Sequence, residues 1–286
     1  DFQTYFDIDL ATTEELRQKT YHIRYRVYCE EFKYEPIEHF PEQMEFDEFE
    51  GQSLHCLITH KLTGTPAGCV RLVCLDDQQI MPMEKYCSHA LDQSFIEGLG
   101  ASRSSFCEFS RLAVDRDFRR RSGEEMSRFG ALTEMDFSKR EMRTFSLIAV
   151  SAFLAGFATS DIIGRRNCFA MMEPFLPRML KRSGIKVQRA GSETDYHGLR
   201  APYFITTEQA VNGLGTDLRE LYDTIHGHFS QQIKSSASGL GVPPAGQSAV
   251  LPAMGLAESL LRKARTLPQD CLNFVGQPDH ALPASV

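Results

Sequence analysis

The chain has 286 residues, 42% of them hydrophobic, which is enough for one large domain or two small ones with a sizeable core. Its net charge of −7 and its 24% of charged residues are ordinary for a soluble globular protein. The chain opens on Asp1 without a basic segment, and its longest apolar stretch, 145–158, is shorter than the roughly 20 residues that span a bilayer. We therefore expect neither a secretory signal nor a membrane span.

The first predicted elements are a short edge strand at 6–10 and a helix from about 13 to 31, with Thr12 and Glu15 as a capping box. Prolines make the next segment irregular. Apolar and β-branched runs predict strands, the first two forming a hairpin, at 53–61, 67–75, 104–114, 168–172, 185–189 and 202–206. Helical patterns occupy 144–159, 174–182 and 215–232. A mixed β-sheet flanked by helices, an α/β fold, is the predicted architecture of residues 1–232.

Residues 233–286 differ from the rest of the chain. Ser, Gly, Pro and Ala dominate from Ser235 to about 253, which predicts a flexible linker. Residues 256–266 have the spacing of one short amphipathic helix. We therefore predict a flexible C-terminal extension outside the folded domain.

Charge and cysteine usage give further constraints. Residues 1–50 carry 14 acids and 5 bases, whereas residues 100–200 carry 18 bases and 12 acids. A basic middle third favours a charged ligand or an acidic partner, although solvated surface explains any single charge.

The eight cysteines include no C-x-x-C pair, so buried free thiols are expected rather than disulfides or a metal site. That usage favours a reducing cytoplasm.

An acidic and aromatic run follows the irregular segment: Met44-Glu45-Phe46-Asp47-Glu48-Phe49-Glu50. In an extended segment Glu45 and Asp47 point the same way, because side chains alternate with period two. Two adjacent carboxylates repel each other unless a cation neutralises them. They could hold an ammonium group or deprotonate it; a solvated acidic loop is the alternative.

A second polar cluster, Glu108, Ser110 and Arg111, lies in an apolar strand, where charges are costly unless paired. Regular strand geometry places Glu108 and Ser110 on one face and Arg111 on the other, so a common site requires a bulge. A structural Glu–Arg pair is the alternative. Arg24 and Arg71 are further lone cations that match the unpaired acids, or that merely extend to solvent.

Five motifs occur in order over about residues 15–207: Arg24-x3-Tyr28, the run 44–50, Arg71-Leu72, Glu108-x-Ser110-Arg111-x2-Val114-Asp115 and Leu180-Lys181-Arg182-Ser183-Gly184. This arrangement resembles the acyl-homoserine-lactone (autoinducer) synthases, the long-chain N-acyl amino acid synthases and the acyltransferases associated with PEP-CTERM/exosortase systems. The resemblance implies a fold like that of the GCN5-related N-acetyltransferases (GNAT). It also implies transfer of a fatty acyl group from acyl carrier protein to an amine.

The resemblance also assigns roles to residues. The polar site residues that it implies are Arg24, Glu45, Asp47, Arg71, Glu108 and Arg111. We predict Glu108, Ser110 and Arg111 as the catalytic group, with Glu108 or a water that it holds as the base. A backbone N–H of the same strand would stabilise the oxyanion. The substrate-binding residues that we predict are Arg24, Tyr28, Glu45, Phe46, Asp47, Phe49 and Arg71.

Two departures bear on the acceptor amine. Autoinducer synthases have a Trp after the first helix, where this chain offers Phe32 or Tyr34, and they end the acidic motif in Asp rather than Glu50. These differences favour the amino-acid-acylating and exosortase-associated relatives over enzymes that use S-adenosylmethionine.

The donor is predicted from a basic segment. Arg120-Arg121-Ser122-Gly123-Glu124-Glu125 is a half match to the pyrophosphate-binding pattern of acetyl-CoA enzymes, which argues against tight CoA binding. Arg116, Arg119, Arg120 and Arg121 suit an acidic carrier protein instead, with solvated surface as the alternative. An acyl-CoA-dependent enzyme and an inactive acyl-binding or regulatory module remain alternative functions. The helix at 145–158 could line an acyl tunnel, although plain core is the favoured interpretation. We expect no tightly bound cofactor, no metal and no nucleic acid.

Overall fold

The computed structural model describes residues 2–119 and 144–238. Within these ranges, eight strands form one mixed sheet in the order β1-β2-β3-β4-β5-β8-β6, with β7 paired to β8 outside this path. The strands are β1 (Phe6–Leu10), β2 (Ser53–His60), β3 (Pro66–Cys74), β4 (Phe106–Val114), β5 (Asn167–Met172), β6 (Gln188–Arg189), β7 (Thr194–Asp195) and β8 (Leu199–Thr206). All neighbouring strands are antiparallel except β4 and β5, which are parallel. The predicted α/β architecture is confirmed.

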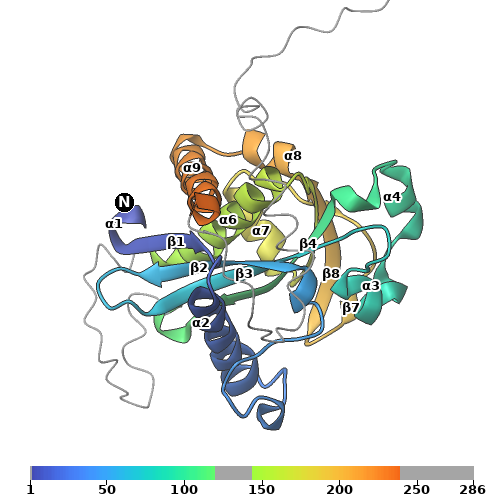
Figure 1. The fold of residues 1–286 in the computed structure, drawn as a ribbon. Coiled ribbons are helices and arrows are strands. Elements are labelled where there is room, and N and C mark those ends of the chain that lie inside the picture. Colours follow the sequence, from blue (N-terminus) through green and yellow to red (C-terminus); the bar gives the residue numbers. More distant parts are fainter. Residues whose placement is uncertain (1, 120–143, 239–286) are drawn as a thin grey trace, which may run out of the picture.

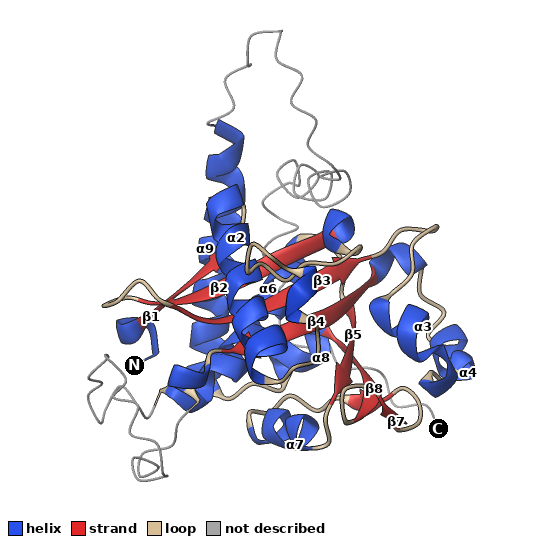
Figure 2. Ribbon diagram, turned by 90° about the horizontal axis from the view of Figure 1, so that it is seen from below, coloured by secondary structure: helices blue, strands red, loops and turns tan. Residues whose placement is uncertain are grey.

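Helices cover both faces of the sheet (Figure 1). The α-helices are α1 (Phe2–Tyr5), α2 (Glu14–Arg24), α3 (Pro82–Cys87), α4 (Gln93–Gly98), α6 (Ile148–Ile162), α7 (Phe175–Arg182), α8 (Thr207–Asn212) and α9 (Thr216–Ser238). Helix α6 packs on one face and is covered by α9, whereas α2 crosses the other face, as the view from below shows (Figure 2). Helices α3 and α4 form an excursion between β3 and β4 that the sequence did not predict.

The first helix begins one residue later than predicted. The capping residue is Thr13, whose side chain accepts a hydrogen bond from the backbone N–H of Leu16 at 3.3 Å. Thr12 cannot serve because it still belongs to the turn that leaves β1. The helix then continues as a π-helical segment, Tyr25–Glu31, so its predicted end at residue 31 is confirmed.

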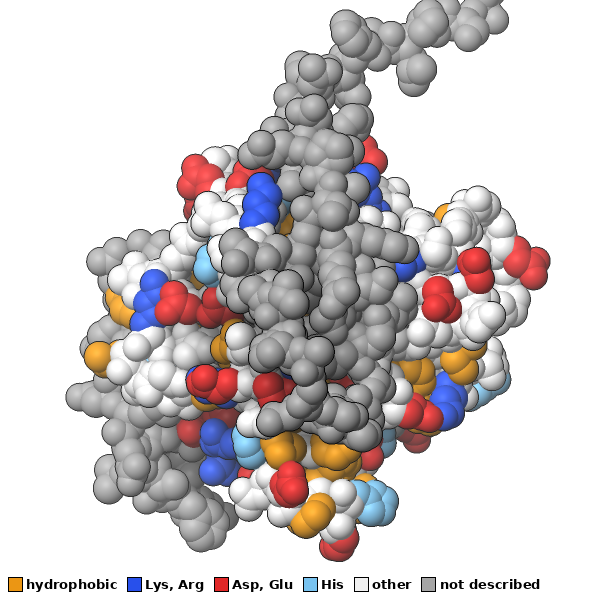
Figure 3. Space-filling model, in the orientation of Figure 1, with side chains coloured by type: hydrophobic (Ala, Val, Ile, Leu, Met, Phe, Trp, Pro, Cys, Tyr) orange, Lys and Arg blue, Asp and Glu red, His pale blue; other side chains and the backbone are white. Residues whose placement is uncertain are grey.

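Helix α6 is the centre of the hydrophobic core. The segment Phe145–Ile162 is long and apolar enough to cross a membrane by length and composition, but 78% of it is buried inside the domain. Its near-continuous burial identifies it as the core helix. The seven cysteines in the described residues are buried and free, as predicted. On the face shown in Figure 3, acidic and basic side chains are interspersed over the described surface.

The C-terminal part of the domain departs from prediction at two places. The predicted strand 185–189 is reduced to the two residues of β6, because Ile185 turns into the core. Helix α9 continues to Ser238, six residues beyond its predicted end and into the predicted linker. The rest of the tail lies outside the described residues, and the domain boundary at 232 stays a prediction.

Gly184, which ends α7, offers a test of the packing. Its φ is +89°, and an added Cβ would lie 1.9 Å from the carbonyl oxygen of Gly213. Gly184→Ala is expected to lower the free energy of unfolding by roughly 2–5 kcal/mol, through left-handed strain and the clash together. Gly164→Ala is the control: φ is +72° but no atom lies within 4 Å of the added Cβ, so only about 1–2 kcal/mol is expected. Equal losses in urea unfolding would show that the close approach to Gly213 is unimportant.

Candidate active site

Three arginines and three carboxylates form one buried cluster beneath β3 and β4. Arg24 contacts Glu45 at 2.5 Å and Glu50 at 2.8 Å. Arg71 contacts Asp47 at 2.5 Å and Glu50 at 3.0 Å. Arg111 completes the cluster through Glu45 at 3.1 Å and Asp47 at 3.2 Å. Because each arginine bridges two acids, the acidic run and the three lone cations of the sequence form one neutral network, which we call the arginine–acid cluster.

The arginine–acid cluster is largely buried, and three of its members are almost fully shielded from water. The side chains of Arg24 and Arg71 are 0% exposed, and that of Glu45 is 1% exposed. Burial alone would raise the pKa of Glu45, but Arg24 and Arg111 outweigh it and hold that pKa below its usual value. The same balance lowers the pKa values of Asp47 and Glu50. The carboxylates are therefore ionised, and each already pairs with two guanidinium groups.

His55 is a member of this cluster that the sequence did not suggest. It is buried on β2 opposite Arg71, and its Nε2 lies 2.7 Å from a carboxylate oxygen of Glu50. Burial lowers the pKa of His55, although Glu50 opposes this effect. The signal that could have revealed it is a histidine at an inward position of an otherwise apolar strand.

Strand β4 contains the bulge on which a common site depends. Cys69 pairs with Ala113 but Arg71 pairs with Ser110, so β4 has one more residue than β3 between these pairs. Arg111 lies within this bulge at φ +50°. The bulge turns the Arg111 side chain toward Glu45 and Asp47 while Ser110 accepts a hydrogen bond from Arg71 Nε at 3.0 Å. The two faces expected for a regular strand therefore converge.

Glu108 lies on β4 just before the bulge and is 3% exposed. One of its carboxyl oxygens accepts a hydrogen bond from the backbone N–H of Met83 on α3 at 2.9 Å. Burial raises its pKa to about 8, although the Met83 hydrogen bond and Arg71 act in the opposite direction. At neutral pH this carboxyl is mostly protonated, and it gains a charge within one or two pH units of neutrality.

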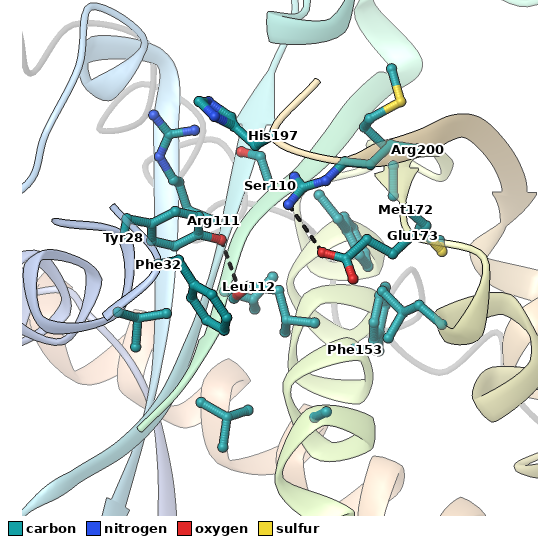
Figure 4. Close-up of a pocket in the computed structure, with 18 of the residues that line it drawn as sticks. Tyr28, Phe32, Ser110, Arg111, Leu112, Phe153, Met172, Glu173, His197 and Arg200 are labelled. Carbon is teal, nitrogen blue, oxygen red and sulfur yellow. Dashed lines mark hydrogen bonds and ion pairs between the residues drawn. The ribbon is translucent and has the colours of Figure 1, made fainter. Parts of the chain in front are cut away.

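A cavity of about 790 Å³ opens beside the bulge. Strands β4 and β5 are paired only as far as Phe109 and Ala170, and the cavity occupies the space where they diverge. Side chains from α6 and α7, among them Phe153, line its apolar part together with the π-helical segment and Phe32, the residue that follows that segment (Figure 4). Its polar lining consists mainly of Tyr28, Tyr34, Glu35, Glu108, Ser110, Arg111, Glu173, Tyr196, His197 and Arg200.

The structure divides the predicted site residues into two groups. Tyr28, Glu108, Ser110 and Arg111 line the cavity, and Tyr28 donates a hydrogen bond to the carbonyl of Leu112 in the bulge at 2.9 Å (Figure 4). The other predicted substrate-binding residues do not line it: Arg24, Glu45, Phe46, Asp47, Phe49 and Arg71. Glu45 and Asp47 pair with Arg111, and Arg71 donates a hydrogen bond to Ser110, so these charged residues contact the cavity wall from behind. Phe46, in contrast, is 53% exposed on the outer surface.

The predicted donor-binding arginines are only partly described. Arg116 is exposed on the surface. Arg119 pairs with Glu31, lies over the ring of Phe32 at 5.0 Å and lines the cavity. Arg120, Arg121 and the half-matched phosphate motif lie outside the described residues.

Several cavity residues were missed by the sequence or only touched upon. Phe32 and Tyr34, both considered for the missing Trp, line the cavity. Tyr196 and His197 come from the turn between β7 and β8, and Arg200 is the second residue of β8; no motif marks them. His197 has φ +54° and its ring stacks on Tyr34 with centroids 4.8 Å apart. Only the folding of β8 beside β5 brings this turn to the cavity.

Residues 23–128 match the family described as an acetyltransferase (GNAT) domain. Among solved structures, the chain is similar to TofI in a ternary complex with an inhibitor and MTA, with 19% identity, a TM-score of 0.52, and coverage of 76% of this chain and 99% of TofI. It is also similar to MesI, a CoA-dependent acyl-homoserine lactone synthase (17% identity, TM-score 0.48, coverage 78% and 95%). A third is FeeM, an N-acyl amino acid synthase from uncultured soil microbes (11% identity, TM-score 0.47, coverage 75% and 97%). No curated protein sequence matches the chain.

These findings confirm the predicted GNAT-like fold and identify an acyltransferase enzyme. At 19% identity the likeness to TofI establishes the fold alone. The donor, the acceptor and the closer resemblance to exosortase-associated acyltransferases stay predictions, as does the cytoplasmic location.

Proposed function

We propose that the protein is an N-acyltransferase that moves a fatty acyl group from the thioester of acyl carrier protein to the amine of a small acceptor, such as an amino acid. The observation that carries this proposal is the cavity between β4 and β5, which joins an apolar lining to a polar one along the same bulged strand. An acyl chain fits the first lining and an amine acceptor the second.

The apolar part of the cavity suits a fatty acyl chain. Phe109 and Leu112 of β4, Phe153 of α6 and Met179 of α7 are among the side chains that line it. A volume of about 790 Å³ lies in the range of pockets that enclose small organic ligands. Two interpretations were considered for the α6 sequence, plain core and the wall of an acyl tunnel. Both apply, because most of the helix is core and one side lines the cavity.

The polar part suits attack by an amine. An α-amine is mostly protonated at neutral pH, and only its neutral form attacks a thioester. Glu108, directly or through a water, would take one proton from the ammonium; the amine nitrogen then bonds to the carbonyl carbon, the C–S bond breaks, and the leaving thiolate receives the second proton that the nitrogen loses as the amide forms. Beyond Phe109 the β4 backbone is no longer paired with β5, so its amides can stabilise the oxyanion or bind the extended pantetheine arm.

In this proposal the arginine–acid cluster positions the reacting groups rather than binding the acceptor. Each of its carboxylates already pairs with two arginines, so an ammonium would have to displace an arginine to bind. Arg111 and Ser110 bond to the cluster and also line the cavity, so the cluster holds this part of the cavity wall in place. A degenerate binding module would have no need for so many buried charges, each of which is costly to bury.

A basic surface beside the cavity favours carrier protein over CoA as donor. Arg178, Lys181, Arg182 and Lys186 are exposed on and after α7, and none of them forms an ion pair within the described part of the chain. The first turn of α7 places Phe175 and Leu176 in the cavity lining. An acidic carrier protein docked on these cations would lie close to the opening into which its pantetheine arm must reach.

The double variant Arg178→Glu, Lys181→Glu is expected to lower kcat/KM for acyl carrier protein donors about tenfold or more, because electrostatic steering sets the rate of encounter. Transfer from acyl-CoA should change little. Initial rates with both donor classes at several salt concentrations, with mass-spectrometric product detection, measure this. Lys19→Glu, an exposed charge reversal on α2, is the control.

Each outcome of the donor experiment has a distinct meaning. Equal use of both donors, unaffected by salt or by the α7 substitutions, would contradict the carrier-protein proposal and favour the acyl-CoA alternative. Tight acyl-chain binding without product from any donor would favour the inactive binding module.

A further inference from the structure

Arg200 on β8 is a cation in the cavity wall whose bonding is incomplete. Its Nη2 lies 3.2 Å from an oxygen of Glu173, its guanidinium lies over the ring of Tyr34 at 5.5 Å, and its buried Nε has no hydrogen-bond partner (Figure 4). Buried donors are normally paired, so an orphaned Nε calls for an explanation.

The ion pair with Glu173 does not explain why the Nε of Arg200 is left without a partner. Glu173 follows β5 directly opposite Arg200, since Met172 is paired with Ala201, so the two charges form a cross-strand contact. The Glu173 side chain is 40% exposed, and an ion pair with one solvated partner contributes little to stability. The contact is single, although a guanidinium can bind a carboxylate through two parallel hydrogen bonds.

Comparison with Arg111 shows why Arg200 is the cation available to a ligand. Arg111 is held by Glu45, Asp47 and Glu35, and its charge belongs to the balanced arginine–acid cluster. Glu35 is not one of the three carboxylates of the arginine–acid cluster. It lines the cavity and contacts Arg111 at 3.4 Å. The polar lining therefore holds Glu35, whose only ion pair in the described residues is the 3.4 Å contact with Arg111, and Arg200, a weakly engaged guanidinium.

We propose that Arg200 binds the carboxylate of a zwitterionic acceptor by exchanging Glu173 for it, while Glu35 faces the acceptor's ammonium group. This inference rests on the proposed acyl transfer and assigns its acceptor the chemistry of an α-amino acid. Tyr34 holds the guanidinium plane from one side, which reduces the freedom that Arg200 loses when it binds. Arg200 is in this sense the specificity-determining residue of the acceptor site.

The test compares α-amino acids with their amides, which keep the amine but lack the carboxylate. Arg200→Gln is expected to raise KM for amino acids roughly 10- to 100-fold, as removal of a charge-assisted hydrogen bond predicts, with kcat and the KM for amides little changed. Arg200→Lys should recover part of the loss. Glu173→Gln should lower KM for amino acids, because it removes the competing carboxylate.

A purely structural role predicts a different pattern. Arg200→Gln and Glu173→Gln would then lower Tm alike and change KM for amino acids and amides by the same factor, which would overturn the proposal. Wild-type protein that acylates amino acids and amides with equal kcat/KM would also overturn it, while the acyl-transfer function would stand. Only the absence of product from wild-type protein with every donor and amine would count against the proposed function itself.

Discussion

Glu108→Gln is expected to lower kcat/KM for acyl transfer by roughly 10²–10⁴-fold, the contribution of a positioned general base. Glutamine has nearly the same shape, and its carbonyl oxygen can still accept the hydrogen bond from Met83 N–H, so the fold should persist. What it cannot do is take a proton from the attacking amine. Steady-state rates with saturating donor and a varied acceptor measure the loss, and near-wild-type turnover would exclude Glu108 as the base.

The pKa of Glu108 fixes the pH dependence of the reaction. The carboxylate is the active form of the base, and burial raises its pKa to about 8. For wild-type protein kcat/KM should therefore rise with pH and level off above about 8. The acceptor amine is also an ionising group, so an acceptor whose amine pKa lies well below 8 separates the two ionisations. With that acceptor the rise should be absent in Glu108→Gln.

The same ionisation affects stability in the opposite direction. The folded protein binds the Glu108 proton more tightly than the unfolded chain, because burial raises the pKa from the ordinary glutamate value of 4.5 to about 8. The stability that this group contributes is therefore complete below about pH 4.5 and is lost as the pH rises through 8. Glu108→Gln lacks this loss, so its stability relative to wild type should increase over that interval. This behaviour would show that a loss of activity is not a loss of fold.

Glu45→Gln is expected to lower the free energy of unfolding by about 3–5 kcal/mol, the usual effect of removing one partner from a buried ion pair. Glu45 is 1% exposed and bridges Arg24 and Arg111, so its loss leaves two guanidinium groups without a shared counter-charge. Activity should fall as well, because Arg111 loses one of the contacts that hold it in the bulge.

Glu48→Gln is the matched control for Glu45→Gln, in the same acidic run. Glu48 is 51% exposed and pairs with Lys85, so about 0–1 kcal/mol is expected. Urea unfolding of both variants at neutral pH gives the comparison. Similar losses for the two substitutions would mean that the arginine–acid cluster does not stabilise the fold more than a surface ion pair does.

The arginine–acid cluster could be predicted from the sequence because charges in apolar strands must find partners. Glu45, Asp47, Arg71 and Arg111 could be paired on that argument alone, and the requirement for a bulge followed from the period of two in a strand. The sequence could not show that the network is buried behind the cavity wall. The charged members of the predicted substrate-binding group lie behind the cavity wall, where they form ion pairs with one another and with Arg111.

The acceptor side of the cavity could not be predicted from local sequence patterns. Arg200 and Glu173 are ordinary charged residues at strand ends, and they meet only because β8 inserts between β5 and β6. Helices α3, α4 and α8 have six residues each, too few for a clear helical period. The backbone N–H of Met83, which holds Glu108, comes from one of these short helices, so the environment of the proposed base could not be derived from its own strand.

The divergence of β4 and β5 means that the ligand cavity and the hydrophobic core share walls. Phe109, Phe118, Phe145 and Phe153 belong to the main core cluster and also line the cavity. If the cavity holds the acyl chain as proposed, a residue that is shortened to admit a longer chain also removes packing from the core. Selectivity for chain length and conformational stability are then coupled properties of the same four rings, and neither can change without affecting the other.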